Sequence, residues 1–250
     1  MLAKPPADVS VVTAVRYLGR NVRRLRRHLA GVPTARDPES VHQVRVACRR
    51  LRAGFRVFRK LLGKERANRW RAALRDLASG LGKARDTDVQ IAAMLGRLGE
   101  SDDPEIRRGI VFWITGLERT RSRCQVQVRR ALRRFLRTGT LRQIREWLSE
   151  AQRTLATVVG KSEVPPAGYE RRLLRRMGQF LELGDSLQDE MDVARHHEFR
   201  IAAKKFRYTL EICAPTLGAQ FEVALEAVRE MQSYLGEIHD CDVWVAELEA

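Results

Sequence analysis

The stretch VHQVRVACRRLRAGFRVFRKLL, residues 41–62, places an apolar stripe and a row of basic residues side by side on one expected helix. The apolar residues recur in steps of three and four, which is the spacing of a single helix face: Val41, Val44, Cys48, Leu51, Phe55, Phe58 and Leu62. The first basic row keeps the same spacing one position later: His42, Arg45, Arg49, Arg52 and Arg56. One residue is a rotation of about 100°. The row therefore flanks the seam that we expect to pack into the core.

The same pattern occurs a second time in the chain. HQVRVACRRLR (42–52) matches HEFRIAAKKFR (197–207) 155 residues later, and LGKARDTDV (81–89) matches LGEIHDCDV (235–243) 154 residues later. Two motifs in one order at nearly one spacing indicate an internal repeat. We expect a helical domain over 9–250, with repeat halves 9–138 and 166–250 joined by a helix and linker at 139–165.

The second copy repeats both features of the first. Its expected seam consists of Phe199, Ala203, Phe206, Leu210 and Cys213. The second basic row lies beside it: His197, Arg200, Lys204 and Arg207.

Helical periodicity dominates the rest of the chain, and alternating strand patterns with turn dipeptides are nearly absent. We predict an all-α fold with these helices: 9–29, from Pro38 to 62, 65–81, 87–98, 104–137, 141–159, 169–187, 196–214, 219–235 and 241 to the end. GKSEVPPAG, residues 160–168, is predicted to be a linker because two prolines and two glycines prevent a continuing helix.

The charge balance points to a polyanionic partner. The formal net charge is +16 and the pI is about 10.7, and a balance so far from neutral costs self-repulsion in a compact chain. A solvated basic surface is the alternative. An apolar fraction of 44% excludes global disorder, and no run approaches the roughly 18 uncharged apolar residues of a membrane span. Without a signal-like N-terminus or a CxxC pair among its four cysteines, the chain is expected to be cytoplasmic.

The first basic row favours anion binding over a solvated face. Residues 41–62 include no aspartate or glutamate, so local i+3 or i+4 ion pairs are missing and neighbouring like charges repel. Side chains in such a row lie about 5–6 Å apart, a spacing that suits successive phosphates of an extended chain. Arginine forks supply paired donors for phosphate oxygens. A histidine heading each row predicts tighter binding somewhat below neutral pH.

These motifs resemble the CHAD domain, the conserved histidine α-helical domain, over nearly the whole chain. The resemblance implies two pseudo-symmetric antiparallel helical bundles around a basic central groove or pore. It also implies binding of inorganic polyphosphate and association with polyphosphate granules in bacteria. The motif residues that carry over are His42, Arg45, Arg49, Arg50 and Arg52, with His197, Arg200, Lys204, Lys205, Arg207 and Tyr208. Glu211 also matches, and with Tyr208 it is expected to orient neighbours.

One departure concerns the helix at 104–137. The second half stops at Ala250, within one short helix of Asp240, so a counterpart of that helix is expected to be missing.

The aspartates of the LGxxxDxD segments and the remaining basic residues give weaker predictions. Asp86 and Asp240 are read as helix N-caps, with Asp88 and Asp242 in the first turns, rather than as metal ligands. We predict no metal site, although a metal shared by His42 and His197 stays open. Further basic rows either extend the polyanion surface or are solvated: Arg16, Arg20, Arg23 and Arg27, and Arg123, Arg130, Arg134 and Arg137.

Catalysis has little support, because GxSxG, HExxH and glycine-rich phosphate loops are missing. We therefore expect a non-enzymatic binding protein without a cofactor. Nucleic-acid binding is the chief alternative, and an aromatic content of 6% counts against base stacking. A metal-dependent hydrolase of polyphosphate or triphosphate is the third reading. The oligomeric state is left open.

Overall fold

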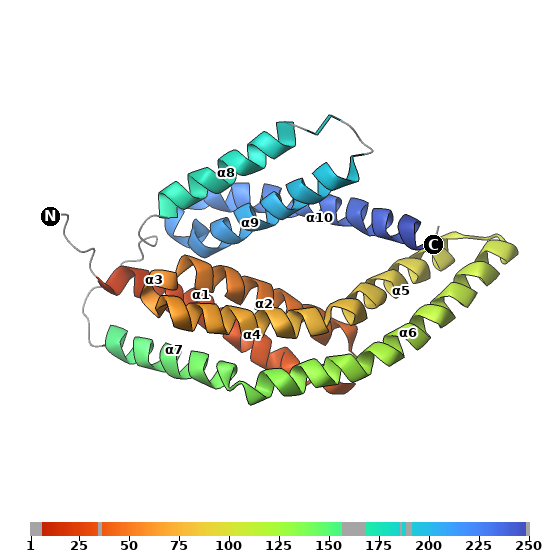
Figure 1. Cartoon of the computed structure of the whole chain (residues 1–250). Helices are drawn as coiled ribbons and strands as arrows, with labels where there is room; N and C mark the ends of the chain where they lie inside the picture. The colour runs from red at the N-terminus through yellow and green to blue at the C-terminus, as the bar shows by residue number, and fades with distance from the viewer. Residues whose placement is uncertain (1–6, 35–36, 157–168, 186, 189–191, 249–250) are drawn as a thin grey trace. The chain divides into compact units, whose positions relative to one another are not determined.

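The computed structural model describes residues 7–34, 37–156, 169–185, 187–188 and 192–248. These residues form ten α-helices and one short 3-10 turn, with no strand among them. The predicted all-α class is confirmed. The chain divides into two compact units, one made of Met1–Tyr17 with Thr154–Ala250 (unit 1) and the other of Leu18–Arg153 (unit 2). Figure 1 labels the helices in chain order.

Unit 2 contains most of the first half of the chain. Its elements are α1 (Ala7–Leu29) from Leu18 onward, η1 (Val32–Thr34), α2 (Pro38–Val57), α3 (Arg59–Leu62), α4 (Lys64–Gly80), α5 (Gly82–Glu100), α6 (Pro104–Arg137) and α7 (Thr140–Ala156) as far as Arg153. Helix α2 packs against α4 and α5, and α6 packs along the same two helices (Figure 1). The first basic row thus lies on a helix held by two neighbours.

Helix α2 begins with a complete N-terminal cap. The Asp37 side chain accepts hydrogen bonds from the Glu39 amide (2.9 Å) and the Ser40 hydroxyl (2.6 Å), and Pro38 occupies the first turn. The contact with Glu39 satisfies one of the amides that lack partners at a helix start. All seven predicted seam residues are buried, as expected from their spacing. Phe55 packs on Trp70 of α4 with ring centroids 5.3 Å apart.

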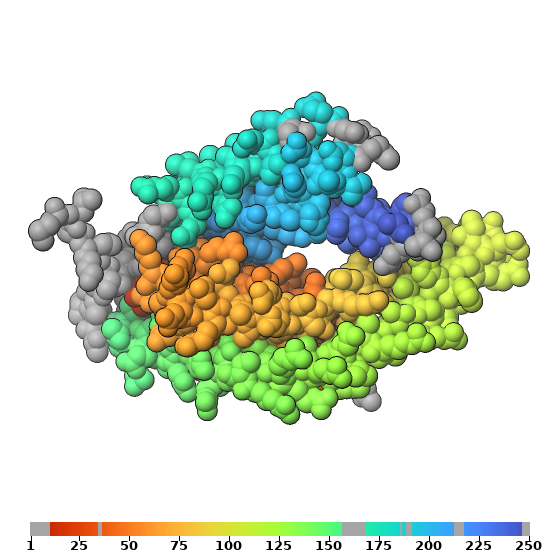
Figure 2. Space-filling view, in the orientation of Figure 1, coloured from red at the N-terminus to blue at the C-terminus, as the bar shows by residue number. Residues whose placement is uncertain are grey.

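Unit 1 contains the second motif on α9. It consists mainly of α8 (Tyr169–Asp185), α9 (Val193–Leu217) and α10 (Ala219–Leu248), with α9 packed against both others. Phe180 of α8 stacks on Phe199 and Phe206 of α9, at centroid distances of 5.1 and 5.4 Å. In the space-filling view, the turquoise α8 lies along α9 (Figure 2). Four predicted seam residues are buried, and the Cys213 side chain is outside the described residues.

Two helix boundaries differ from the sequence prediction. Helix α5 begins at Gly82 rather than residue 87, and α10 runs without a break through the two helices predicted at 219–235 and from 241. Asp86 and Asp240 are therefore inside helices and cap neither, so the N-cap reading is wrong. At the α4–α5 junction the Leu81 amide donates to Leu77 and the Arg85 amide donates to Leu81. The backbone ladder continues across the junction, so no cap is needed there.

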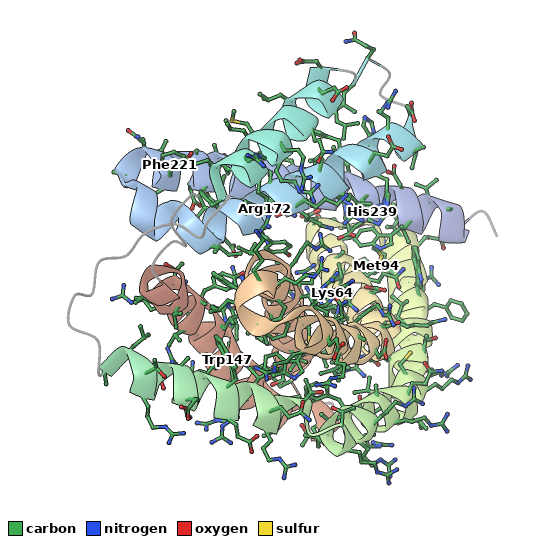
Figure 3. The ribbon with its side chains drawn as sticks, turned by 60° about the vertical axis from the view of Figure 1, so that its left-hand side comes forward. Lys64, Met94, Trp147, Arg172, Phe221 and His239 are labelled. Carbon is green, nitrogen blue, oxygen red and sulfur yellow. The ribbon has the colours of Figure 1, made fainter. Side chains whose placement is uncertain are left out.

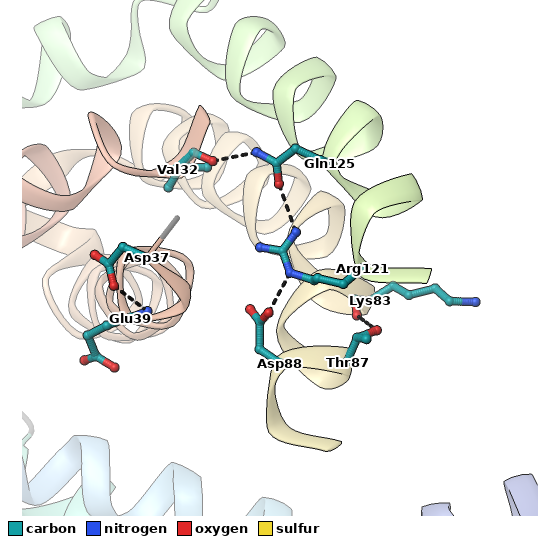
Figure 4. Close-up of polar contacts among 8 residues, drawn as sticks. All are labelled: Val32, Asp37, Glu39, Lys83, Thr87, Asp88, Arg121 and Gln125. Atoms are coloured by element: carbon teal, nitrogen blue, oxygen red, sulfur yellow. Dashed lines mark hydrogen bonds and ion pairs between the residues drawn. The ribbon is translucent and has the colours of Figure 1, made fainter. Parts of the chain in front are cut away.

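Asp88 lies inside α5, not in the first turn of a helix, and belongs to a buried polar network (Figure 4). Arg121 of α6 donates from Nε to Asp88 Oδ1 at 2.6 Å and from Nη1 to Gln125 Oε1 at 2.9 Å. The Gln125 amide then donates to the carbonyls of Val32 and Pro33, at 2.8 and 3.0 Å. This network joins α5 and α6 to the turn that leads into α2.

Smaller differences affect other helix ends. A break at Phe58 separates α2 from α3, and Gly63, with φ of 83°, ends α3 as predicted. Helix α6 has the predicted bounds Pro104–Arg137, capped by Asp103. Helix α8 ends two residues before the predicted end, and α9 extends beyond its prediction at both ends. The predicted linker at 160–168 is outside the described residues.

The cysteines differ in accessibility. Cys48 and Cys124 are buried, Cys241 is exposed, and burial raises the pKa of Cys48 to about 12. Among the described residues no helix combines the length and hydropathy that a membrane crossing requires.

Candidate functional site

The first basic row forms a cluster at the interface of α2, α4 and α5. His42, Arg45 and Arg49 are half-buried. Arg45 donates from Nη1 to the carbonyl oxygen of Ala78 on α4 at 2.7 Å, and its Nη2 lies 3.9 Å from Asp86 Oδ1 on α5. The Arg45 guanidinium is therefore positioned by contacts with α4 and α5.

Arg85 of α5 adds a charge that the row itself does not contain. Burial lowers the pKa of His42 first, and the charge of Arg85 lowers it next, followed by Arg49 and Arg45, with Glu39 opposing. We name His42, Arg45, Arg49 and Arg85 the unit 2 cluster. Sequence reasoning missed Arg85 because it lies in another motif. The internal repeat could have identified Arg85, because alignment of LGKARDTDV with LGEIHDCDV places Arg85 opposite His239.

Further along α2, Arg52 meets arginines of α4. Burial lowers the pKa of Arg52, and the charge of Arg71 and then that of Arg75 also lower it, partly offset by Asp76. The Nε atoms of Arg49 and Arg71 are buried without a hydrogen-bond acceptor among the described residues. An unsatisfied buried donor costs free energy. A ligand with acceptor oxygens would relieve this cost.

Unit 1 has a corresponding cluster on α9 and α10. The rings of His197 and His239 lie 5.5 Å apart between centroids. Burial lowers the pKa of His239, as do the charges of Arg200, His197 and Lys204, while Asp240 raises it. We name His197, Arg200, Lys204 and His239 the unit 1 cluster, and Figure 3 labels His239 on α10. In both units the motif helix packs beside the helix that carries the LGxxxDxD segment.

Other predicted site residues are placed differently. Arg207 forms an ion pair with Glu211 at 3.8 Å, and its guanidinium lies 4.9 Å from the centroid of the Tyr208 ring. Both neighbours thus contact this arginine. The remaining predicted residues are half-buried Arg50, exposed Arg56 and Lys205, and exposed Arg16, Arg20 and Arg27. Nothing assigns the last three to either cluster.

A separate hollow of about 510 Å³ lies between α4 and α7. Trp70 and Trp147 line it with arginines and with Glu146 and Glu150. Glu146 and Glu150 form ion pairs with Arg142 and Arg153 on α7. The two carboxylates offset most of the charge of the three arginines that line the hollow, so it is a poorer phosphate site than the more strongly cationic clusters. In the described part of the chain, no three histidine, cysteine, aspartate or glutamate side chains are grouped to hold a metal ion.

Comparison with known families agrees with the motifs and the helical fold. The family model described as the CHAD domain matches residues 16–249. The chain belongs to the CHAD family. No curated protein matches it.

Two solved structures extend the comparison beyond the family match. The CHAD domain from the plant Ricinus communis matches with a TM-score of 0.70 and 25% identity, over 94% of this chain and 76% of that one. PptA from Streptomyces chartreusis matches with a TM-score of 0.51 and 16% identity, over 88% of this chain and 81% of that one. The second likeness supports the helical fold alone.

Proposed function

We propose that this CHAD protein binds inorganic polyphosphate without catalysing its hydrolysis, and that the clusters, one in each of two pseudo-symmetric bundles, supply the binding groups. The observation that carries the proposal is a set of partly buried cations on the two motif helices and on α5. In unit 2, Arg49 and Arg85 form no ion pair with a described carboxylate, and Arg49 Nε is a buried donor without an acceptor. Such donors require an anion or water.

Linear polyphosphate suits the shape of these clusters. Successive residues of a row lie about 5–6 Å apart on one helix face, and Arg45 is held in position by Ala78 and Asp86. Preorganised guanidinium groups lose less entropy when they bind phosphate. Association with polyphosphate granules would follow from the same contacts, and the cytoplasm is the location that we propose for it.

Nucleic acid is the main competing ligand, because any polyanion gains affinity through counterion release. Single-strand binders also stack bases on accessible rings. Phe55 of α2 and Phe199 of α9 instead pack internally, against Trp70 and Phe180, and the exposed rings of Phe112 and Tyr234 belong to neither cluster. This favours a ligand that offers charge without bases.

A competition experiment at controlled salt distinguishes these ligands. Labelled long-chain polyphosphate bound to the protein is displaced with unlabelled polyphosphate, single-stranded DNA or RNA at equal phosphate concentration. We expect polyphosphate to compete best; equal competition by all three would contradict the assignment. Phosphate release that depends on divalent cations would instead favour a hydrolase.

A double variant tests the clusters directly. Arg45→Ala with Arg200→Ala should weaken polyphosphate binding and reduce the slope of log K against log salt by about 0.7–0.9 per lost phosphate contact, by analogy with nucleic acids. Far-UV circular dichroism checks that the helices remain. Normal binding together with easy unfolding would show that these arginines only support the fold.

A further inference from the structure

The two clusters differ at one equivalent position. Unit 2 has Arg85, which carries a permanent charge, where unit 1 has His239, a titratable imidazole whose pKa is lowered by burial and by the charge of Arg200. The unit 1 cluster consequently contains two imidazoles, His197 and His239, 5.5 Å apart. The unit 2 cluster has one imidazole, His42, whose pKa is lowered by burial and then by the charges of Arg85, Arg49 and Arg45, with Glu39 opposing.

The groups around His239 set how it responds to an anion. Arg200, His197 and Lys204 act on it from α9, and Asp240 acts from α10 itself. Helix α8 packs on α9 through Phe180 and adds the charges of its own arginines to unit 1: Arg171, Arg172, Arg175 and Arg176. Without a ligand the cationic neighbours disfavour a proton on His239. A phosphate chain among them reverses the balance, because its negative oxygens stabilise each imidazolium.

We propose that anion binding at the unit 1 cluster is coupled to proton uptake by the His197–His239 pair, whereas the unit 2 cluster binds mainly through fixed arginine charge. The inference rests on the proposed function and adds a regulatory property to it. The protons come from solvent, and no covalent bond changes. Affinity in unit 1 then rises as the pH falls through the neutral range, because uptake and affinity are linked.

Calorimetric titration of the full chain with polyphosphate at pH 7.5 measures this coupling. Binding heats in buffers of different ionisation enthalpy give the number of protons taken up. His239→Arg makes unit 1 resemble unit 2, and uptake should fall by up to about one proton; Arg85→His should raise it by up to about one. His196→Gln, on α9 but outside the cluster, is the matched control and should leave uptake unchanged.

The outcomes separate the two proposals. If polyphosphate binds and His239→Arg leaves the proton uptake unchanged, the coupling is overturned but the proposed function is kept. No binding of polyphosphate overturns both. If the arginine variant does not fold, histidine NMR titration of the wild-type chain replaces it. Tripolyphosphate should then raise the titration midpoint of His239, and an unchanged midpoint in the bound chain overturns the coupling.

Discussion

Arg85 supplies charge to the unit 2 cluster from α5, and its removal tests that contribution. Arg85→Ala should weaken polyphosphate binding, lower the salt slope by about 0.7–0.9 if one phosphate contact is lost, and raise the pKa of His42. The last effect follows because Arg85 is, after burial, the main influence that lowers this pKa. Salt-dependent affinity and histidine NMR titration measure the two effects.

Arg108→Ala is the matched control for that substitution. Arg108 is exposed on α6 and paired with Glu105 at 2.7 Å, away from the clusters by sequence and packing. Arg108→Ala removes the same formal charge from the chain as Arg85→Ala. If both variants lose affinity equally, only total charge matters and the unit 2 cluster has no special role.

The residues of the two clusters show which parts of the candidate site could be predicted from the sequence. Periodicity predicted the buried seam of α2 and the adjacent row, because both lie on one helix and need only the 100° geometry. Arg71, Arg85 and His239 were not predicted as site residues, since they come from neighbouring helices and their contacts depend on tertiary packing. The sequence pattern also did not predict that Arg45 contacts the Ala78 carbonyl and the Asp86 carboxylate.

The Asp88–Arg121–Gln125 network should dominate the stability of the α5–α6 contact. Arg121→Ala leaves the buried Asp88 carboxylate without its partner, and breaking a buried pair in this way costs about 3–5 kcal/mol. Arg108→Ala, which breaks an exposed pair, should cost at most about 1 kcal/mol. Urea unfolding gives both values; similar losses would mean that the network contributes no more than a surface pair.

Helices α4 and α6 approach each other closely at Gly80, and this contact leads to a prediction about stability. A Cβ at Gly80 would lie 2.3 Å from Ala131 Cβ, so the helices must move apart to accept it. Gly80→Ala should therefore destabilise unit 2 by about 1–3 kcal/mol. Gly96→Ala on α5 meets nothing within 4 Å and should be neutral or stabilising by up to about 1 kcal/mol.

A double-mutant cycle isolates the Gly80 contact. Adding Ala131→Gly to Gly80→Ala should recover part of the lost stability, since one methyl is then exchanged between facing helices. Strict additivity of the two unfolding free energies would show that the helices do not meet at these residues.

Helix boundaries were predictable where local chemistry decides them. Asp103 and Pro104 mark the start of α6, and both sequence and structure place it there. Asp86 and Asp240 looked similar in sequence, yet they are inside helices because the ladder continues through LGxxxDxD. The burial of Asp88 depends on Arg121, 33 residues later, which no local cap pattern shows.

For the whole molecule, the lowered pKa values of His42 and His239 set the acid side of the stability curve. The unfolded state binds more protons than the native state near the ordinary histidine pKa of 6.5. Stability from these groups is therefore present above about pH 6.5 and decreases as the pH falls. Thermal unfolding of the ligand-free chain between pH 8 and 5.5 measures it. His42→Gln with His239→Gln should flatten the dependence; an equally steep curve would assign it to other groups.

The exposed Cys241 has a practical consequence for studying both units together. It is two residues from His239, or about 200° around α10, so a probe attached there points away from the unit 1 cluster. Cys48 and Cys124 are buried and should resist labelling. With a second label at Arg108→Cys, after Cys213→Ser, pulsed electron paramagnetic resonance can follow the distance between α10 and α6. If one polyphosphate chain binds to both clusters at once, its addition should narrow that distance distribution.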